Sequence, residues 1–201
     1  MITTDLKLIT FPARPVNGGP FDKAPPKSGE WLYEPKYNGW RALVHVPTGS
    51  LFNRHGQSLS IGEEFVDAIL ELQRINDAVC RIEWLDCEAL ERRHRIGQGC
   101  LVVLDLIDEA SQPCRVRREL LHDLFPEPAS LRPATAKFPL LSVPPAVFAD
   151  TAWHDLQRIN REIGCPFYEG LVAKRADSTY PIQHRSPHET FPFWVKHRWA
   201  F

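Results

Sequence analysis

Alternating apolar and polar residues run through much of the chain and predict short β-strands. β-branched and aromatic residues are concentrated in the same segments. We expect strands over residues 31–36, 40–46, 50–54, 82–90, 100–107, 168–174 and 192–198. Short turns such as "PTGS" at 47–50 join several of them, and such turns are typical of antiparallel sheets.

Three other segments repeat their apolar residues every three or four positions, as amphipathic helices do. Their ranges and apolar faces are 62–75 with Phe65, Ile69 and Leu72, 115–125 with Val116, Leu120 and Leu124, and 151–163 with Trp153, Leu156 and Ile159. Asp150 or Thr151 is the expected N-cap of the third helix. Because the strands come in runs, we predict an α+β fold in which helices flank mainly antiparallel sheets.

Chain length and proline content define the expected domain organisation. The 201 residues suit a single domain. The 18 prolines cluster at 12–26, 126–145 and 181–192, where they predict irregular structure. We therefore expect a loose Pro/Gly-rich segment over residues 1–29 and one folded domain over residues 30–201.

Charge and cysteine content exclude several classes of protein. A formal net charge of -1 provides no overall attraction to nucleic acid, so a polyanion must bind a local patch. The five cysteines are scattered without a Cys-x-x-Cys pair, which argues against a disulfide framework and a zinc ribbon. Neither a secretory signal nor an apolar run long enough to span a bilayer is present, so we expect a cytoplasmic protein without a membrane partner.

Six segments place charged residues within or beside predicted strands. They are "EPKYNGWR" (34–41), "FNRHG" (52–56), "WLDCEAL" (84–90), "VVLDLID" (102–108), "YEGLVAKR" (168–175) and "FWVKHR" (193–198). Their cations are Lys36, Arg41, Arg54, Lys174, Lys196 and Arg198, and their anions include Glu34, Glu88, Asp105 and Glu169. Buried charges are costly and usually meet a partner. Cations suit phosphates and carboxylates suit Mg²⁺, so the set fits a nucleotide with its metal ion; salt bridges at sheet edges are the alternative.

In this order, the segments resemble the nucleotidyltransferase motifs of ATP-dependent DNA ligases, which RNA ligases and mRNA capping enzymes share more loosely. The resemblance covers about residues 30–198. It implies the ligase-type nucleotidyltransferase fold, which is ATP-grasp-like. It also implies that Lys36 attacks the α-phosphorus of ATP, with Mg²⁺ or Mn²⁺ as the metal ion. The resulting lysyl-AMP would transfer AMP to a 5′-phosphate nucleic-acid end for nick sealing.

The roles of the other residues come from the same resemblance. Glu34 would lie beside the adenine amino group and Val172 against one face of the base. Glu88 would lie near the ribose and, with Glu169, would hold the metal ion. The remaining cations of the motifs are Arg41, Arg54, Lys174, Lys196 and Arg198, of which Arg54 would reach the ribose or the phosphate of a nucleic-acid end.

The nucleophile itself must lose a proton before it can react. We expect partial burial and nearby cations such as Lys196 and Arg198 to lower the pKa of Lys36. The same cations would stabilise the negative charge on the α-phosphate during the reaction.

The chain departs from the ligase pattern at three points. Asn38 stands where DNA ligases mostly have Asp, and Leu104 where many have an aromatic residue that stacks on adenine. An aliphatic side chain at that position forgoes an aromatic stacking energy of about 1 kcal/mol. The sequence ends at Phe201, without the OB-fold domain of DNA ligases, so we expect a catalytic core that seals through its own surface or with a separate OB-fold or end-binding protein.

Two alternatives to a DNA ligase stay open. One is a non-catalytic module that binds nucleotides or nucleic-acid ends, and the other is an adenylyltransferase of the RNA ligase type. Nicked duplex DNA is the preferred partner, and "ERRHR" (91–95) and "RVRR" (115–118) offer phosphate contacts, unless the second is an ordinary solvated helix face. His184 and His188 lie near Glu189, but no third spaced His or Cys supports a zinc site there.

Overall fold

The chain forms two β-sheets flanked by helices. We describe it from a computed structural model, which covers residues 11–21, 26, 29–79, 82–90, 96–125, 129, 131, 138–184, 186 and 188–199. The strands are β1 Arg14–Gly19, β2 Trp31–Tyr37, β3 Trp40–His45, β4 Ser50–Phe52, β5 Trp84–Leu90, β6 Cys100–Leu106, β7 Leu141–Ser142, β8 Tyr168–Arg175 and β9 Thr190–Arg198. The main helices are α1 Val66–Val79, α2 Cys114–Leu124 and α3 Ala149–Ile163, with 3₁₀ turns at Gly62–Phe65 and Ile107–Glu109.

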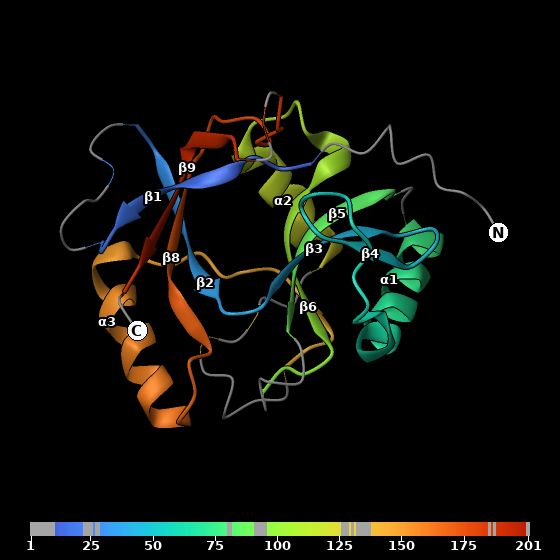
Figure 1. The fold of residues 1–201 in the computed structure, drawn as a ribbon, viewed down its shortest axis with the longest axis horizontal. Helices are drawn as coiled ribbons and strands as arrows, with labels where there is room; N and C mark the ends of the chain where they lie inside the picture. The colour runs from blue at the N-terminus through green and yellow to red at the C-terminus, as the bar shows by residue number, and fades with distance from the viewer. Residues whose placement is uncertain are drawn as a thin grey trace.

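The two sheets divide the strands unequally. The first has the order β1-β9-β8-β2, and the second has the order β4-β3-β5-β6-β7. All pairs are antiparallel except β1 with β9 and β6 with β7. The chain passes from the first sheet to the second directly between β2 and β3, and Figure 1 shows the two sheets side by side at this point. The segment "EPKYNGWR" therefore lies at the junction of the two sheets.

Three apolar clusters form the core of the described residues, and two of them contain residues from both sheets. One core lies between the second sheet and helices α1 and α2, and contains Phe65, Leu72 and Leu121. A second core joins α3 to β2 and β8 and contains Trp153, Leu156 and Ile159. Helix α3 lies outside the first sheet and α1 outside the second (Figure 1). The α+β architecture with helices on the outer faces is therefore as the sequence predicts.

The seven predicted strands are all present, with ends that differ by a few residues, and two strands were missed. The two-residue β7 is too short to show a pattern. Strand β1 lies within the proline cluster that we expected to be irregular and loose, and this expectation was wrong for residues 14–19. It forms because its backbone pairs in parallel with β9, which lies far away in the sequence.

The three predicted helices are also present, with two corrections. The N-cap of α3 is Phe148 and has no side-chain cap hydrogen bond, so Asp150 and Thr151 lie inside the first turn. In α2 the buried residues are Cys114, Arg117 and Leu121, whereas Leu120 is exposed. The predicted apolar face of α2 was partly wrong: Leu124 does pack against the core, but Leu120 does not, because a periodicity argument counts the buried Arg117 as polar and outward-facing. No helix in the described part of the chain is long and apolar enough to cross a membrane.

Candidate active site

Lys36 lies near the end of β2, where three strands bring oppositely charged side chains together. Strand β2 pairs with β8, which places Lys36 opposite Gly170, and β8 pairs with β9, which places Gly170 opposite Arg198. The Lys36 Nζ atom lies 2.6 Å from Glu169 Oε2. Arg198 Nη2 lies 2.5 Å from the same oxygen. Glu169 therefore holds the side chain of Lys36 beside a second cation.

Gly170 makes this close approach possible. Its φ of +149° is rarely adopted by residues with a side chain, and an added Cβ would lie 1.9 Å from the backbone oxygen of His197. Strands β8 and β9 can therefore come together here only at a glycine. The close pairing sets the distance between Glu169 and Arg198.

Charge also determines the state of the Glu169 carboxylate. Burial disfavours its ionised form, but the ammonium of Lys36 and the guanidinium of Arg198 outweigh this effect and lower its pKa below the ordinary value. Glu169 is thus an ionised carboxylate at neutral pH.

Glu88 enters the same region from β5 in the second sheet. Its Oε1 atom accepts a hydrogen bond of 2.8 Å from the backbone N–H of Gly39, in the connection between β2 and β3. Burial raises the pKa of Glu88, and repulsion from Glu169 adds to the rise, although Lys36, the Gly39 N–H and Arg41 oppose it. A buried carboxylate with a raised pKa is typical of a functional site.

This raised pKa predicts that Glu88 lowers the stability of the ligand-free protein. The unfolded chain ionises near the ordinary value of 4.5, before the folded chain does, so the penalty grows as pH rises above that value and is complete above the folded-state pKa. Glu88→Gln, which keeps an acceptor for Gly39, is expected to raise the melting temperature at pH 7. The gain should vanish below pH 4, and a gain that is equal at all pH values would contradict this explanation.

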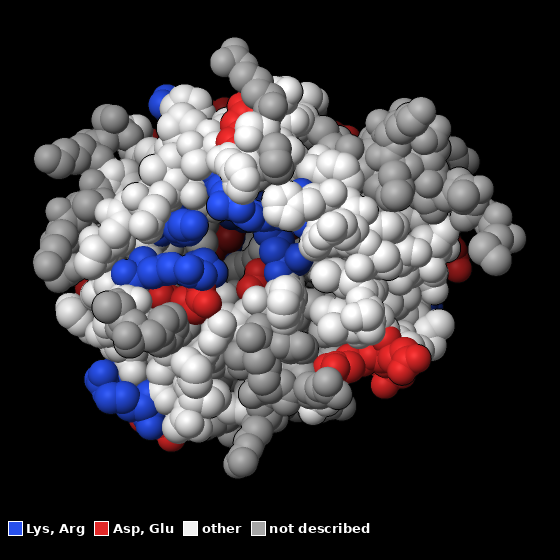
Figure 2. Space-filling view, in the orientation of Figure 1, with Lys and Arg blue, Asp and Glu red and all other residues white. Residues whose placement is uncertain are grey.

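A cavity of about 390 Å³ opens beside Lys36. It is lined by every nucleotide-binding residue expected from the sequence, namely Glu34, Lys36, Arg41, Arg54, Glu88, Leu104, Val172, Lys174, Lys196 and Arg198. Figure 2 shows basic side chains gathered around a central hollow, with acidic side chains inside it. The structure thus brings residues from both sheets and six segments to one cavity, while their individual roles stay predictions.

Sequence reasoning missed several residues that line this cavity, including Trp194 and Trp40. Trp194 is buried, and the ammonium of Lys174 lies 4.4 Å from the centre of its ring. Its position in the motif "FWVKHR", two residues before Lys196, could have identified it from the sequence. Leu104 lines the cavity where many ligases have an aromatic residue, and the exposed aromatic side chain in this lining is that of Trp40.

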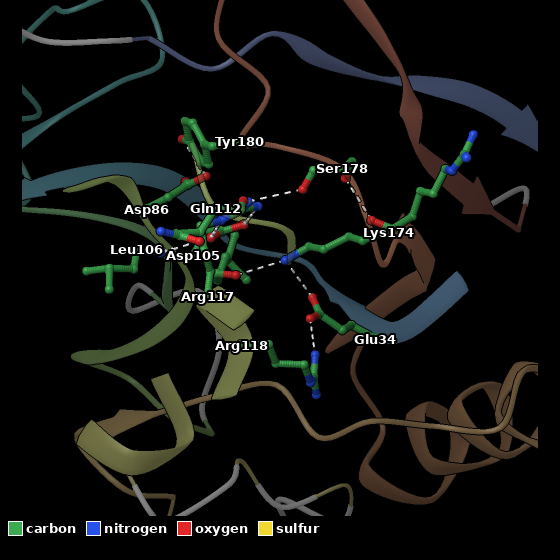
Figure 3. A network of polar contacts seen from close by, with 12 residues as sticks. Glu34, Asp86, Asp105, Leu106, Gln112, Arg117, Arg118, Lys174, Ser178 and Tyr180 are labelled. Atoms are coloured by element: carbon green, nitrogen blue, oxygen red, sulfur yellow. Dashed lines mark hydrogen bonds and ion pairs between the residues drawn. The ribbon is translucent and has the colours of Figure 1, made fainter. Parts of the chain in front are cut away.

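A chain of buried ion pairs supports the wall of the cavity (Figure 3). Glu34 accepts from Arg118 through one carboxylate oxygen and pairs with Lys174 at 2.9 Å through the other. Lys174 also donates to the Leu104 carbonyl at 2.8 Å. Glu34 thus lines the cavity with its carboxylate oriented by two cations.

The same network corrects two expectations. Asp105 pairs with Arg117 at 2.6 Å, with both side chains buried, so it supports the fold and does not face the nucleotide cavity. In "RVRR" (115–118), neither Arg117 nor Arg118 projects toward solvent, so they do not form the proposed duplex contact or a solvated helix face. The basic segment "ERRHR" (91–95) lies outside the described residues.

Arg41 is also part of the buried network. It donates to both oxygens of Asp86, which also accepts a 2.9 Å hydrogen bond from Tyr180. Arg41 lines the cavity, but the positive charge of its guanidinium is already neutralised by the Asp86 carboxylate.

Asn38 has a structural role that explains its departure from the ligase pattern. Its Nδ2 atom donates a 2.9 Å hydrogen bond to the Pro166 carbonyl, and its backbone N–H donates to the Phe167 carbonyl at 3.0 Å. An aspartate at this position cannot donate. The amide thus ties the loop after Lys36 to the start of β8.

We expect Asn38→Asp to destabilise the protein by about 1 kcal/mol, the usual value of a side-chain hydrogen bond, because a carboxylate would face the Pro166 carbonyl. Urea unfolding at pH 7 measures this difference. Asn76→Asp is a suitable control, since Asn76 Oδ1 accepts a hydrogen bond from the backbone N–H of Ile82 and this acceptor role survives the change. Equal effects of the two substitutions would argue against the role of Asn38.

The carboxylates beside Lys36 fit a magnesium ion. Mg²⁺ commonly takes one or two carboxylates and completes its shell with water and phosphate oxygens. Glu88 and Glu169 are close enough for their charges to repel, which a divalent ion would relieve. In the described ranges no group of three or more His, Cys, Asp and Glu side chains could hold a metal ion, and the backbone N–H of His184 donates to Glu189.

Comparison with known proteins identifies the fold. Neither a protein-family model nor a curated protein sequence matches the chain. Solved structures do share its architecture, and these are ATP-dependent DNA ligases. The chain therefore has the nucleotidyltransferase fold of the DNA ligases, as its ordered motifs predict.

Three solved structures illustrate the similarity. The ligase domain of M. tuberculosis LigD has a TM-score of 0.58 and 20% identity, over 94% of this chain and 59% of that chain. A mycobacterial DNA ligase D complexed with ATP and MES has a TM-score of 0.60 and 22% identity, over 94% and 60%. The Chlorella virus DNA ligase-adenylate has a TM-score of 0.52 and 14% identity, over 94% and 68%. The chain spans about three-fifths of the two mycobacterial structures, and the identities establish a common fold only.

Proposed function

We propose that the protein is an ATP-dependent nucleotidyltransferase of the DNA ligase type, in which Lys36 carries AMP as a covalent intermediate. One observation supports this most strongly. Lys36, Glu169 and Arg198 meet from three strands at the side of a cavity that all other expected nucleotide-binding residues line. Salt bridges at scattered sheet edges would not converge on a cavity in this way.

The proposed first step is an in-line displacement at the α-phosphorus of ATP. The Lys36 amine gives up a proton, and its lone pair forms a P–N bond. The bond between the α-phosphorus and the oxygen that bridges to the β-phosphate breaks, and pyrophosphate leaves with the electron pair. Lys196 and Arg198, which line the cavity, are placed to stabilise the charge that develops on the phosphate.

The ionised carboxylates would hold the metal ion. Glu169 and Glu88 are the residues that fit Mg²⁺ or Mn²⁺. When bound, the ion would supply positive charge to the phosphates of ATP. In the ligand-free protein, Lys36 is ion-paired with Glu169, so the amine must leave this partner before it can attack.

The base would occupy the part of the cavity between Val172, Leu104 and Glu34. Glu34 is held by Arg118 and Lys174 as a pure hydrogen-bond acceptor. Such a group favours a base edge that donates, as the 6-amino group of adenine does. This supports ATP as the nucleotide.

For the second step we propose transfer of AMP to a 5′-phosphate nucleic-acid end, most often at a nick in duplex DNA. The DNA ligase fold and the cations around the cavity support this acceptor. A separate OB-fold or end-binding protein would extend the contact with the duplex. A parallel sealing assay on nicked DNA, a nicked DNA–RNA hybrid and single-stranded RNA separates this proposal from an RNA ligase-type enzyme.

Self-adenylation tests the proposal directly. The purified protein is incubated with α-labelled ATP and Mg²⁺ between pH 6 and 9, and the label on the protein is measured. We expect the amount of label on the protein to increase with pH, because the attack requires the free amine. We also expect added pyrophosphate to release the label from the protein. No labelling at any pH, together with binding of nucleotide or nucleic-acid ends, would instead identify a non-catalytic binding module.

A further inference from the structure

Arg118 of α2 contacts one residue of the cavity lining without lining the cavity itself. Its side chain is only 11% exposed. Its Nη1 atom donates to Glu34 Oε1, and its Nη2 atom donates to the Pro144 carbonyl at 2.8 Å. Glu34 is among the residues that line the cavity, and Arg118 is not. An effect of Arg118 on a bound base must therefore pass through Glu34.

Backbone hydrogen bonds fix α2, and with it this arginine, relative to the first sheet. The N–H of Cys114, the first residue of the helix, donates to the Ser178 carbonyl at 2.8 Å. The N–H of Arg115 donates at 3.0 Å to the carbonyl of Ala176, which directly follows β8. Because β8 pairs with β2, the start of α2 is held at a set distance from the strand that carries Glu34.

The second anchor of Arg118 is tied to the same strand. Pro144 lies in the segment that joins β7 to α3. A few residues further on, the N–H of Val147 donates to the Tyr33 carbonyl of β2 at 3.0 Å, and Tyr33 directly precedes Glu34. The planar guanidinium thus spans two groups whose separation is fixed, so it holds one oxygen of the carboxylate in a defined direction.

Lys174 holds the other oxygen of Glu34, at 2.9 Å. Figure 3 shows Arg118 and Lys174 reaching Glu34 from different sides. Glu34 lies opposite Val172 across β2 and β8, so the side chains of Glu34, Val172 and Lys174 project from one face of the first sheet. Each carboxylate oxygen can accept more than one hydrogen bond, which leaves capacity for a donor on a bound base.

We propose that Arg118 is a positioning residue that sets the base preference of the cavity. It holds the Glu34 carboxylate in the orientation that accepts a hydrogen bond from the 6-amino group of adenine and opposes the 6-oxygen of guanine, which is itself an acceptor. The inference rests on the proposed function, in which Glu34 lies beside the base. Without Arg118, the carboxylate keeps Lys174 but loses one of the two contacts that orient it.

Nucleoside monophosphates test this inference separately from adenylation, because they carry no pyrophosphate leaving group. Isothermal titration calorimetry measures the Kd of AMP, of GMP, and of purine riboside 5′-monophosphate, which lacks the 6-amino group. The readout is the ratio of the Kd of purine riboside monophosphate to the Kd of AMP, because the contributions of the sugar and the phosphate cancel in it.

Four proteins are compared in this assay. They are wild type, Arg118→Met, Arg118→Lys and Arg115→Ala. Arg118→Met removes the charge and both hydrogen bonds but keeps a long unbranched side chain. Arg115→Ala is the control because Arg115 is an exposed arginine of the same helix, and its backbone hydrogen bond survives the change.

We expect wild type to prefer AMP over purine riboside monophosphate about tenfold, the contribution of one hydrogen bond to a carboxylate. Arg118→Met should reduce this ratio to about twofold and should change the Kd of purine riboside monophosphate by less than about twofold. It should also narrow the gap between AMP and GMP. Arg118→Lys should give an intermediate ratio, because an ammonium keeps the charge but lacks the fork. Arg115→Ala should keep the wild-type ratio.

A ratio that is unchanged in both Arg118 variants would overturn the inference. Equal weakening of all three nucleotides would also overturn it, because it indicates a general structural role. The same holds for a wild type that does not distinguish AMP from purine riboside monophosphate. Melting curves without ligand show whether each variant is folded, and Arg118→Lys decides the result if Arg118→Met is not.

The inference and the proposed function can fail separately. A protein whose preference for AMP depends on Arg118 but that is never labelled by ATP would retain the inference and refute the proposed adenylation. A protein that is labelled by ATP but keeps its base preference without Arg118 would retain the proposed function and refute the inference.

Discussion

Lys36→Arg is expected to reduce labelling of the protein by α-labelled ATP to background. The guanidinium keeps its positive charge at all accessible pH values and cannot supply the lone pair that forms the P–N bond. It can still pair with Glu169, so the local structure around the 2.6 Å contact should survive. Lys36→Ala should also abolish labelling, and in both variants nucleotide binding should persist at reduced affinity.

Two controls make this result decisive. Arg74→Ala changes an exposed cation far along α1 and should label like wild type. The adduct of the wild-type protein should be lost in acid and stable in alkali, as a phosphoramidate is. Labelling of Lys36→Arg at the wild-type level would place the nucleotide on another residue and refute the assignment of Lys36.

Arg117→Met is expected to destabilise the protein by about 3–5 kcal/mol, the usual cost of removing one partner of a buried ion pair. Arg117 is fully buried and donates to both oxygens of Asp105, to the Gln112 carbonyl and, at 3.2 Å, to the Ser178 carbonyl. Its loss leaves the Asp105 carboxylate buried, with the Leu106 N–H as its remaining hydrogen-bond donor among the described residues. Urea unfolding at pH 7 measures the difference.

Two matched variants test why Arg117→Met loses stability. Arg117→Met combined with Asp105→Asn removes both charges, keeps the acceptor for Leu106, and should recover most of the stability. Arg115→Ala, on the exposed face of the same helix, should change the free energy of unfolding by less than about 0.5 kcal/mol. If the double variant is no more stable than Arg117→Met, packing and not charge accounts for the role of Arg117.

Most of the correct predictions came from the alternation of residues in the strands and from the order of the motifs. Seven strands and three helices were predicted because alternation and helical periodicity report which face of an element is buried. The motifs also identified residues that line one cavity, because charged residues within strands commonly belong to a ligand-binding site. Arg117 and Arg118 were misassigned, because the sequence shows that a residue is charged but not which carboxylate it will meet.

Strand β1 shows the same limit for backbone structure. Its residues "RPVNGG" have no strand pattern, and they form a strand because β9 presents unpaired backbone groups beside them.

By itself, the sequence determined the elements, the α+β class and the residue types from which the site is built, because these depend on local periodicity and on chemistry that each residue carries alone. Only the tertiary structure decided which charges neutralise one another inside the protein and which have no carboxylate partner among the described residues. Glu34, Asp86 and Asp105 are matched by Arg118, Arg41 and Arg117, whereas Arg14, Arg54 and Lys196 have no such partner in the described residues. This division depends on distances across two sheets, and distances between remote segments exist only in the folded chain.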